Sequence, residues 1–308
     1  MDPIFHHILV PLDGSKIAEL ALPAATAIAK KSGGALHLAT VHSALPVSVV
    51  AEAPGLASSI DSELREDARS YLTNAAATAS KAGITVDTAV DEADGTVARS
   101  LADHIATSGV DLVVMTTHGH GGMSRLWLGS VADRLLRQVM VPVLLARPAD
   151  GPLRSSFPRI LVALDGSDEG HQVWQTAIRF GSVVDASEYL LVEVVEPSTP
   201  VVEGIAIEPR WVRPEPPVDV EAIADGYLET VAEQFHRRGL TATTTVITGR
   251  GIGRSLVDYA RQARADLIVI GTRGARGLER LILGSVADKV IRSAPRPVLV
   301  VPTARSVV

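Results

Sequence analysis

Residues 8–15 read ILVPLDGS, and residues 160–167 read ILVALDGS. Each stretch is a continuous apolar run that ends in Asp-Gly-Ser, which predicts a buried strand followed by a turn and a helix N-cap. A second match lies further along each copy, where residues 125–133 read RLWLGSVAD and residues 280–288 read RLILGSVAD. The order is kept and the spacing changes little, so the chain is an internal repeat. A period of about 150 residues is the size of a whole domain, far above that of solenoid repeats.

The repeat sets the expected domain boundaries. We expect a first domain over residues 1–148, a linker over 149–158 and a second domain over 159–308. Within the second domain, residues 196–220 hold six of the chain's 18 prolines and predict a long ordered loop or lid. Its composition is equally typical of a surface loop without a function and of a functional loop.

Composition limits the class of protein. Of the 308 residues, 46% are hydrophobic and only 4% are aromatic, so the core must consist of Val, Leu, Ile and Ala, as in buried parallel sheets. There is no cysteine, which excludes disulfides and thiolate chemistry. The net charge of −6 argues against a nucleic-acid partner. No apolar run is long enough to predict a membrane span, so we expect a cytoplasmic protein without a membrane partner.

Apolar runs and helical patterns alternate along both copies. Strands are expected at 8–12, 35–41, 84–90, 111–115, 141–145, 159–164, 188–195, 242–247, 266–271 and 297–301. Four helices are expected in the first copy. One follows the Asp-Gly-Ser turn and ends near residue 31, a second ends near residue 83, and the others cover 97–106 and 126–138. This alternation predicts an α/β fold with two tandem open parallel five-stranded sheets flanked by helices.

A glycine-rich turn follows the fourth strand of each copy. In the second copy it reads GTRG at 271–274, then nine residues, then Gly-Ser at 284–285. In the first copy it reads TTHG at 116–119, then nine residues, then Gly-Ser at 129–130. Glycines let the backbone approach phosphate oxygens, and the following helix adds the positive end of its dipole. The turn therefore predicts a phosphate site.

Asp13 and Asp165 follow the first strand of each copy. The carboxyl ends of parallel strands share one edge, so both aspartates open toward the glycine turn of their copy. They are placed to accept a hydrogen bond from a ribose hydroxyl or an adenine amino group. Asp-Gly-Ser alone is also the pattern of a helix cap. The recurrence of aspartate and glycine turn together in both copies favours a nucleotide site.

The absence of known catalytic motifs from the sequence indicates nucleotide binding without efficient turnover. There is no Walker A sequence, no lysine in the glycine turn, and no carboxylate pair arranged for a metal and a general base. Arg125 and Arg280 could each bind a phosphate, lie in solvent or contact the partner chain of a dimer. His118 and His120 could be read as a metal pair, but Arg273 and an alanine replace them in the second copy.

These motifs resemble those of the universal stress protein family, in its tandem two-domain, ATP-binding form. The resemblance covers nearly the whole chain outside 196–220 and implies a Rossmann-like, adenine nucleotide alpha hydrolase-like sheet of order 3-2-1-4-5. It implies ATP with Mg²⁺ as the ligand and pairing of the two domains through their fifth strands. Unpaired apolar edges at 141–145 and 297–301 would be an aggregation hazard, which agrees with that pairing. A homodimer is implied by analogy alone.

The resemblance also assigns site residues. The strand-one aspartate falls on Asp13 and Asp165, and the strand-two residue whose backbone meets adenine falls on Val41 and Val194. The phosphate loop falls on Gly119, Gly129 and Ser130 in the first copy, and on Gly271, Gly274, Gly284 and Ser285 in the second. Thr116 stands where the second copy has Gly271, so the second site matches the family pattern better.

Three functions follow from this reading. The first is a nucleotide-dependent regulatory module in a stress response, with an unknown protein partner. The second is a slow ATPase or autokinase, and the third is a protein-interaction module that binds no nucleotide. The intact glycines of the second copy argue against the third.

Overall fold

The computed structural model describes residues 5–43, 50, 54–93, 95–117, 128–147, 151–196, 219–272 and 283–303. Its strands form a single ten-stranded sheet of order β3-β2-β1-β4-β5-β10-β9-β6-β7-β8. Their bounds are β1 His7–Pro11, β2 Ala35–His42, β3 Val86–Glu92, β4 Leu112–Thr116, β5 Val143–Ala146, β6 Arg159–Leu164, β7 Glu188–Val195, β8 Ala242–Thr248, β9 Leu267–Gly271 and β10 Val298–Val301. The predicted α/β class and the order 3-2-1-4-5 within each copy are confirmed.

The helices cover both faces of this sheet. Their bounds are α1 Lys16–Glu19, α2 Leu22–Ser32, α4 Pro54–Ser80, α5 Val97–Thr107, α6 Ser130–Gln138, α7 Gly170–Gly181, α8 Val220–His236, α9 Ile252–Gln262 and α10 Ser285–Ser293. The single helix expected up to about residue 31 is wrong, because the chain forms a short α1 and then α2. The helix expected from residue 126 begins at Ser130, where Gly129 is the N-cap. Among the described residues no helix has the length and apolar character that crossing a membrane requires.

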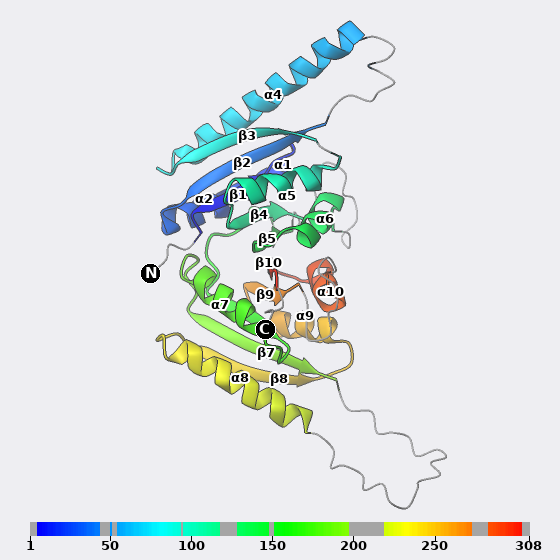
Figure 1. The fold of residues 1–308 in the computed structure, drawn as a ribbon. Coiled ribbons are helices and arrows are strands. Elements are labelled where there is room, and N and C mark those ends of the chain that lie inside the picture. The colour runs from blue at the N-terminus through cyan, green and yellow to red at the C-terminus, as the bar shows by residue number, and fades with distance from the viewer. Residues whose placement is uncertain are drawn as a thin grey trace, which may run out of the picture.

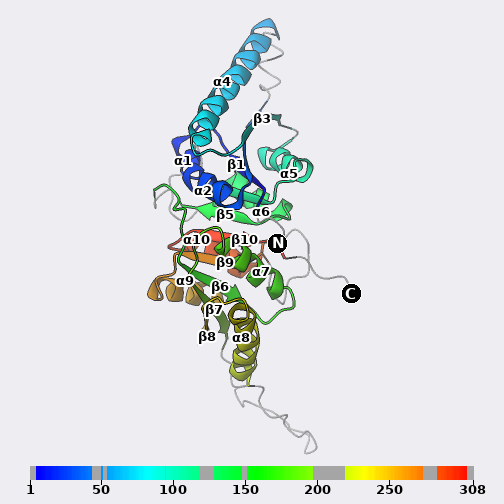
Figure 2. The same cartoon turned by 90° about the vertical axis from the view of Figure 1, so that its left-hand side faces the viewer.

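The two copies join through their fifth strands. β5 and β10 pair antiparallel, with Leu144 opposite Leu299, whereas the strands within each copy pair in parallel. Figures 1 and 2 show this pair in the middle of the molecule, with α4 at one end and α8 at the other. Two sheets that would each expose an apolar edge therefore cover one another, as the fifth-strand pairing predicts.

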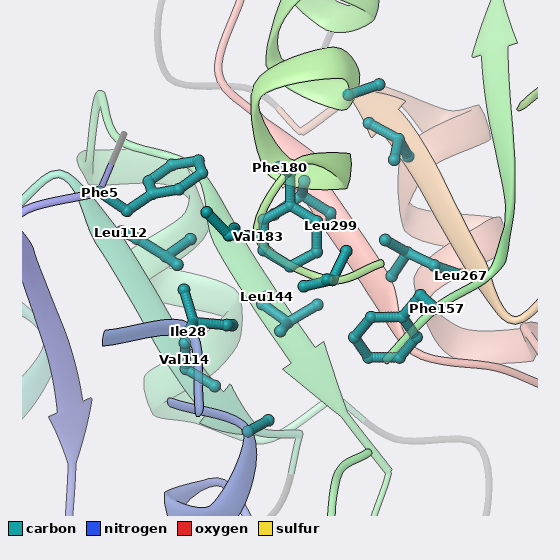
Figure 3. Packing of buried hydrophobic residues seen from close by; sticks show 14 of the residues in the cluster. Phe5, Ile28, Leu112, Val114, Leu144, Phe157, Phe180, Val183, Leu267 and Leu299 are labelled. Atoms are coloured by element: carbon teal, nitrogen blue, oxygen red, sulfur yellow. The ribbon is translucent and has the colours of Figure 1, made fainter. Parts of the chain in front are cut away.

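The hydrophobic core is continuous across that join. One buried cluster unites β1, β4 and β5 of the first copy with β6, β9 and β10 of the second, beneath α2, α4, α7 and α8. Figure 3 shows residues of both copies in contact there, including Leu144 and Leu299 from the paired strands. A second cluster on the other face lies beneath α5, α6, α9 and α10. The two copies consequently fold as one packed body rather than as separate globules.

The segments predicted as linker and insertion differ in what the structure describes. In the linker, the backbone N–H of Leu153 donates to the Leu20 carbonyl at 2.9 Å, and that of Phe157 donates to the Val184 carbonyl at 2.8 Å. Both side chains are buried, so the described part of the linker is packed against the domains. Residues 197–218 of the proline-rich insertion lie outside the described residues. Val220, placed in that insertion, is instead the first residue of α8, whose N-cap is Asp219.

Candidate functional site

The turn after the first strand has the same geometry in both copies. The Ser15 and Ser167 hydroxyls each donate to Oδ1 of the aspartate two residues earlier, Asp13 and Asp165, at 2.6 Å. Ser15 is also the N-cap of α1, accepting from the Ala18 N–H, so the helix-cap interpretation holds there. In the second copy the N-cap of α7 is Glu169 instead. Both aspartates stay exposed at the carboxyl edge of the sheet.

A glycine is the N-cap of the helix that follows the glycine turn in both copies. Gly284 is the N-cap of α10 with φ −61° and ψ 148°, and Gly129 is the N-cap of α6 with φ −58° and ψ 147°. Any residue can adopt these angles, so the backbone does not require glycine here. Neither helix has a side-chain cap, although the first N–H groups of a helix lack partners within it. The missing side chain leaves these donors open to a ligand.

A cavity of about 1040 Å³ lies at the carboxyl ends of β6, β7 and β9. Five residues predicted for the second nucleotide site line it together: Asp165, Val194, Gly271, Gly284 and Ser285. They come from four segments spread over residues 165–285, and the parallel strand order brings these segments to one edge. Gly274, also predicted for this site, lies outside the described residues.

In the first copy, the predicted residues occupy the equivalent positions on the strands and on the helix start. Val41 lies on β2 directly before its last residue, Asp13 follows β1, and Gly129 and Ser130 begin α6. The Gly129 N–H donates to the Thr117 carbonyl at 2.7 Å, and the Gly284 N–H makes the same bond to Thr272 at 2.7 Å. Gly119 lies outside the described residues.

Basic side chains line one wall of the large cavity. Arg254 from α9 and Lys289 from α10 both lie there, and both residues are exposed. Gly253 makes the two helices close neighbours, because a Cβ at this position would lie 3.0 Å from Cβ and Cγ of Lys289. This wall adjoins the open N-terminus of α10, whose dipole adds to the positive charge of Lys289, while Arg254 also pairs with Asp258 at 3.7 Å.

Acidic residues also line the cavity. Glu193 and Glu196 line the cavity beside Asp165. Burial, and secondarily the Asp165 carboxylate, raise the pKa of the Glu193 carboxyl above its usual range. Within the described structure, neither Glu193 Oε2 nor the nearby Tyr227 hydroxyl has a hydrogen-bond partner, although both atoms are buried. Buried polar atoms without partners are uncommon and call for a ligand or water to satisfy them.

Sequence reasoning did not identify Arg254, Lys289 or Glu193. One signal was available for Lys289, which lies four residues after Ser285 and so on the same face of α10. The proposed arginines Arg125 and Arg280 and the histidines His118 and His120 all lie outside the described residues. Within the described part of the chain, no group of three His, Asp or Glu side chains could hold a metal ion.

Comparison with known proteins agrees with the repeat and the fold. The family model of the universal stress protein family matches residues 4–147 and again residues 156–302. The chain belongs to the universal stress protein family. Among its family relatives, a universal stress protein of Methanocaldococcus jannaschii is 35% identical over 145 residues, which cover 47% of this chain and 82% of that protein.

Two further universal stress proteins match a larger share of the chain. One from Mycolicibacterium smegmatis is 28% identical over 228 residues, covering 71% of this chain and 69% of that protein. The crystal structure of one from Archaeoglobus fulgidus has a TM-score of 0.72 at 21% identity, covering 97% of this chain and 98% of the other. That likeness supports the tandem fold. The names of these relatives describe stress proteins rather than enzymes.

Proposed function

We propose that this universal stress protein binds ATP with Mg²⁺ in the large cavity of its second copy, and that occupancy acts as a regulatory signal in a stress response, without efficient turnover. The observation that carries the proposal is the convergence of Asp165, Val194, Gly271, Gly284 and Ser285 on one cavity. Its volume of about 1040 Å³ lies just above the range of about 300–1,000 Å³ that small-molecule sites usually occupy, so the cavity has room for a nucleotide.

The charges of the walls support one orientation of the nucleotide. The phosphates would lie at the N-terminus of α10 between Arg254 and Lys289, where helix dipole and cationic side chains attract anions. The sugar would lie against Asp165, whose carboxylate accepts hydrogen bonds from hydroxyls. Mg²⁺ is commonly held by substrate phosphates with only one or two protein carboxylates, so the ion would rest chiefly on the nucleotide.

We extend the proposal to the first copy, with Asp13, Val41, Gly119, Gly129 and Ser130 as its site residues. By analogy with the family we also propose a homodimer in the cytoplasm and an unidentified protein partner. Because β5 and β10 already cover one another, a homodimer would use other surfaces.

An alternative function is slow ATP hydrolysis or autophosphorylation. It is favoured by one observation, that Asp165, Glu193 and Glu196 line the same cavity as the glycine turn. A carboxylate whose pKa is raised by burial is a known form of general base.

The test is to denature freshly purified protein and to identify and count the released nucleotide by chromatography and mass spectrometry. About two ATP per chain would support two sites, and about one would support the second copy alone. Mostly ADP would favour the ATPase alternative and call for a turnover assay. No release, followed by no binding in a direct ATP titration, would refute the proposal in favour of a nucleotide-free interaction module.

A further inference from the structure

A second cavity lies where the linker crosses the join between the two copies. Its volume is about 130 Å³, an eighth of the large cavity. Its walls come from four segments. These are Arg147 directly after β5, linker residues 151–154 with Phe157, Asp266 directly before β9, and Arg296 with Pro297 before β10. It opens far from the glycine turn of the second copy, because the amino and carboxyl ends of parallel strands lie at opposite edges of the sheet.

The walls of this small cavity carry three arginines. Arg147, Arg154 and Arg296 all line it, each from a different segment. In the ranges that the structure describes, neither Arg154 nor Arg296 forms an ion pair or a side-chain hydrogen bond. The Arg147 guanidinium donates to the carbonyl of Arg292. Like charges held around one small space repel one another, so an anion between them would stabilise the arrangement.

The one carboxylate in the cavity wall has a structural role of its own. Asp266 Oδ2 accepts a hydrogen bond from the backbone N–H of Arg159 at 3.1 Å, which ties the loop before β9 to the start of β6. The first copy repeats this contact, because Asp111 Oδ1 accepts from the backbone N–H of His7 at 3.1 Å. Asp266 is therefore explained by the fold, and Arg147 is held in place by the Arg292 carbonyl, whereas the described structure gives Arg154 and Arg296 no such contact.

The arginines are also specific to one of the two symmetry-related edges. In the alignment that pairs Gly129 with Gly284, Arg296 corresponds to Val141 and Arg147 corresponds to Pro302. Arg154 belongs to the linker and has no counterpart in the other copy. Both copies complete the same sheet, so its architecture does not demand basic residues at these positions.

We propose that Arg147, Arg154 and Arg296 form an anion site, here named the linker anion site, for a single phosphate-sized oxyanion. Guanidinium groups bind phosphate through paired N–H donors and are the usual choice for this chemistry. The volume admits one phosphoryl group but not a nucleotide, so the ligand is inorganic phosphate or the terminal phosphoryl of a phosphomonoester. Binding would tie the linker to the start of β10 and so fix the two copies together at this edge.

Limited trypsin digestion tests this site, because Arg154 is an exposed linker residue after which trypsin cleaves. Sodium phosphate is compared with sodium chloride at equal ionic strength, since general screening is then the same. If the site exists, phosphate at ten times its dissociation constant slows cleavage after Arg154 by about tenfold, by mass action. Chloride has no such effect.

Three variants make the result specific. Arg296→Gln removes protection, whereas Lys30→Gln, which removes an exposed charge at the end of α2, retains it. The double variant Gly129→Val, Gly284→Val retains it too, which excludes phosphate bound at the N-terminus of α6 or of α10 as the cause. The unfolding transition of each variant checks that it is folded.

A parallel digestion with glycerol phosphate identifies the source of the anion. Protection by both compounds supports a site for phosphomonoesters, and protection by inorganic phosphate alone supports a site for the free ion. Absence of protection in the unaltered protein, or equal protection in folded Arg296→Gln, would overturn the proposal.

Discussion

Replacing Gly284 with valine tests the nucleotide site at the point where the structure is most specific. The N-cap angles of Gly284, φ −61° and ψ 148°, are open to valine without backbone strain. The added side chain would stand at the mouth of α10 beside Ser285, where the phosphates are proposed to bind. Gly129→Val is the matched control, because φ −58° and ψ 147° make its backbone equivalent in the first copy.

The expected loss follows from the donors that valine would block. A hydrogen bond to a charged group contributes about 1.5–3 kcal/mol, so losing two first-turn N–H contacts costs about 3–6 kcal/mol of binding free energy. At about 1.4 kcal/mol per tenfold, the ATP dissociation constant of the second site rises by about 10²–10⁴-fold. The free energy of unfolding falls by only about 1 kcal/mol, because glycine is a better N-cap than valine.

Isothermal titration with MgATP, after removal of bound nucleotide, measures both sites in each variant. Gly284→Val should eliminate one class of site, and Gly129→Val should leave that class unchanged. Chemical denaturation confirms that both variants are folded. A folded Gly284→Val protein that binds ATP with the unaltered affinity and stoichiometry would refute the assignment of phosphates to the N-terminus of α10.

Two further changes test the packing around the site and the core. Glu193→Gln should raise the free energy of unfolding at pH 8, and this gain should shrink toward pH 4. The reason is that the folded protein favours the neutral Glu193 carboxyl, as its raised pKa shows, so the wild-type protein loses stability as the pH rises through that pKa. Denaturant titrations at both pH values measure the effect, and an equal gain at the two would contradict this reasoning. Gly181→Ala should cost about 1–3 kcal/mol by overpacking, because its Cβ would lie 2.8 Å from Cζ of buried Tyr189 and closer still to its hydroxyl. Recovery in Gly181→Ala combined with Tyr189→Phe would identify the hydroxyl as the cause, and a stabilised single variant would exclude overpacking.

Sequence reasoning predicted the strands well because their signal is local. Each strand is a short apolar run between turn residues, and each observed strand overlaps its predicted range. The predicted helix boundaries were less accurate than the strands, because the ends of these helices depend on tertiary packing. The helix expected from residue 126 begins at Ser130, and the chain after Ser15 forms two helices rather than one. Both differences depend on how short helices pack, which periodicity does not encode.

The candidate site was predictable only in part. Asp165, Gly284 and Ser285 could be proposed because they recur in both copies at matching positions, and the strand order places them at one edge. Arg254 recurs as Arg99 but carries no binding motif, and Glu193 belongs to none, so their place in the cavity depends on which helix and strand lie beside them.

The amino-acid sequence by itself determined the tandem repeat, the alternation of strands and helices, and the glycine turns, because these are patterns of neighbouring residues. Tertiary structure alone decided that Arg254 and Lys289 line the same cavity as Asp165 and Glu193, and that three arginines gather at the linker. It also shows the pairing of β5 and β10 that the family resemblance implies. The physical reason is that such contacts join residues distant in the chain. Their formation depends on the summed packing of the whole core rather than on any local preference.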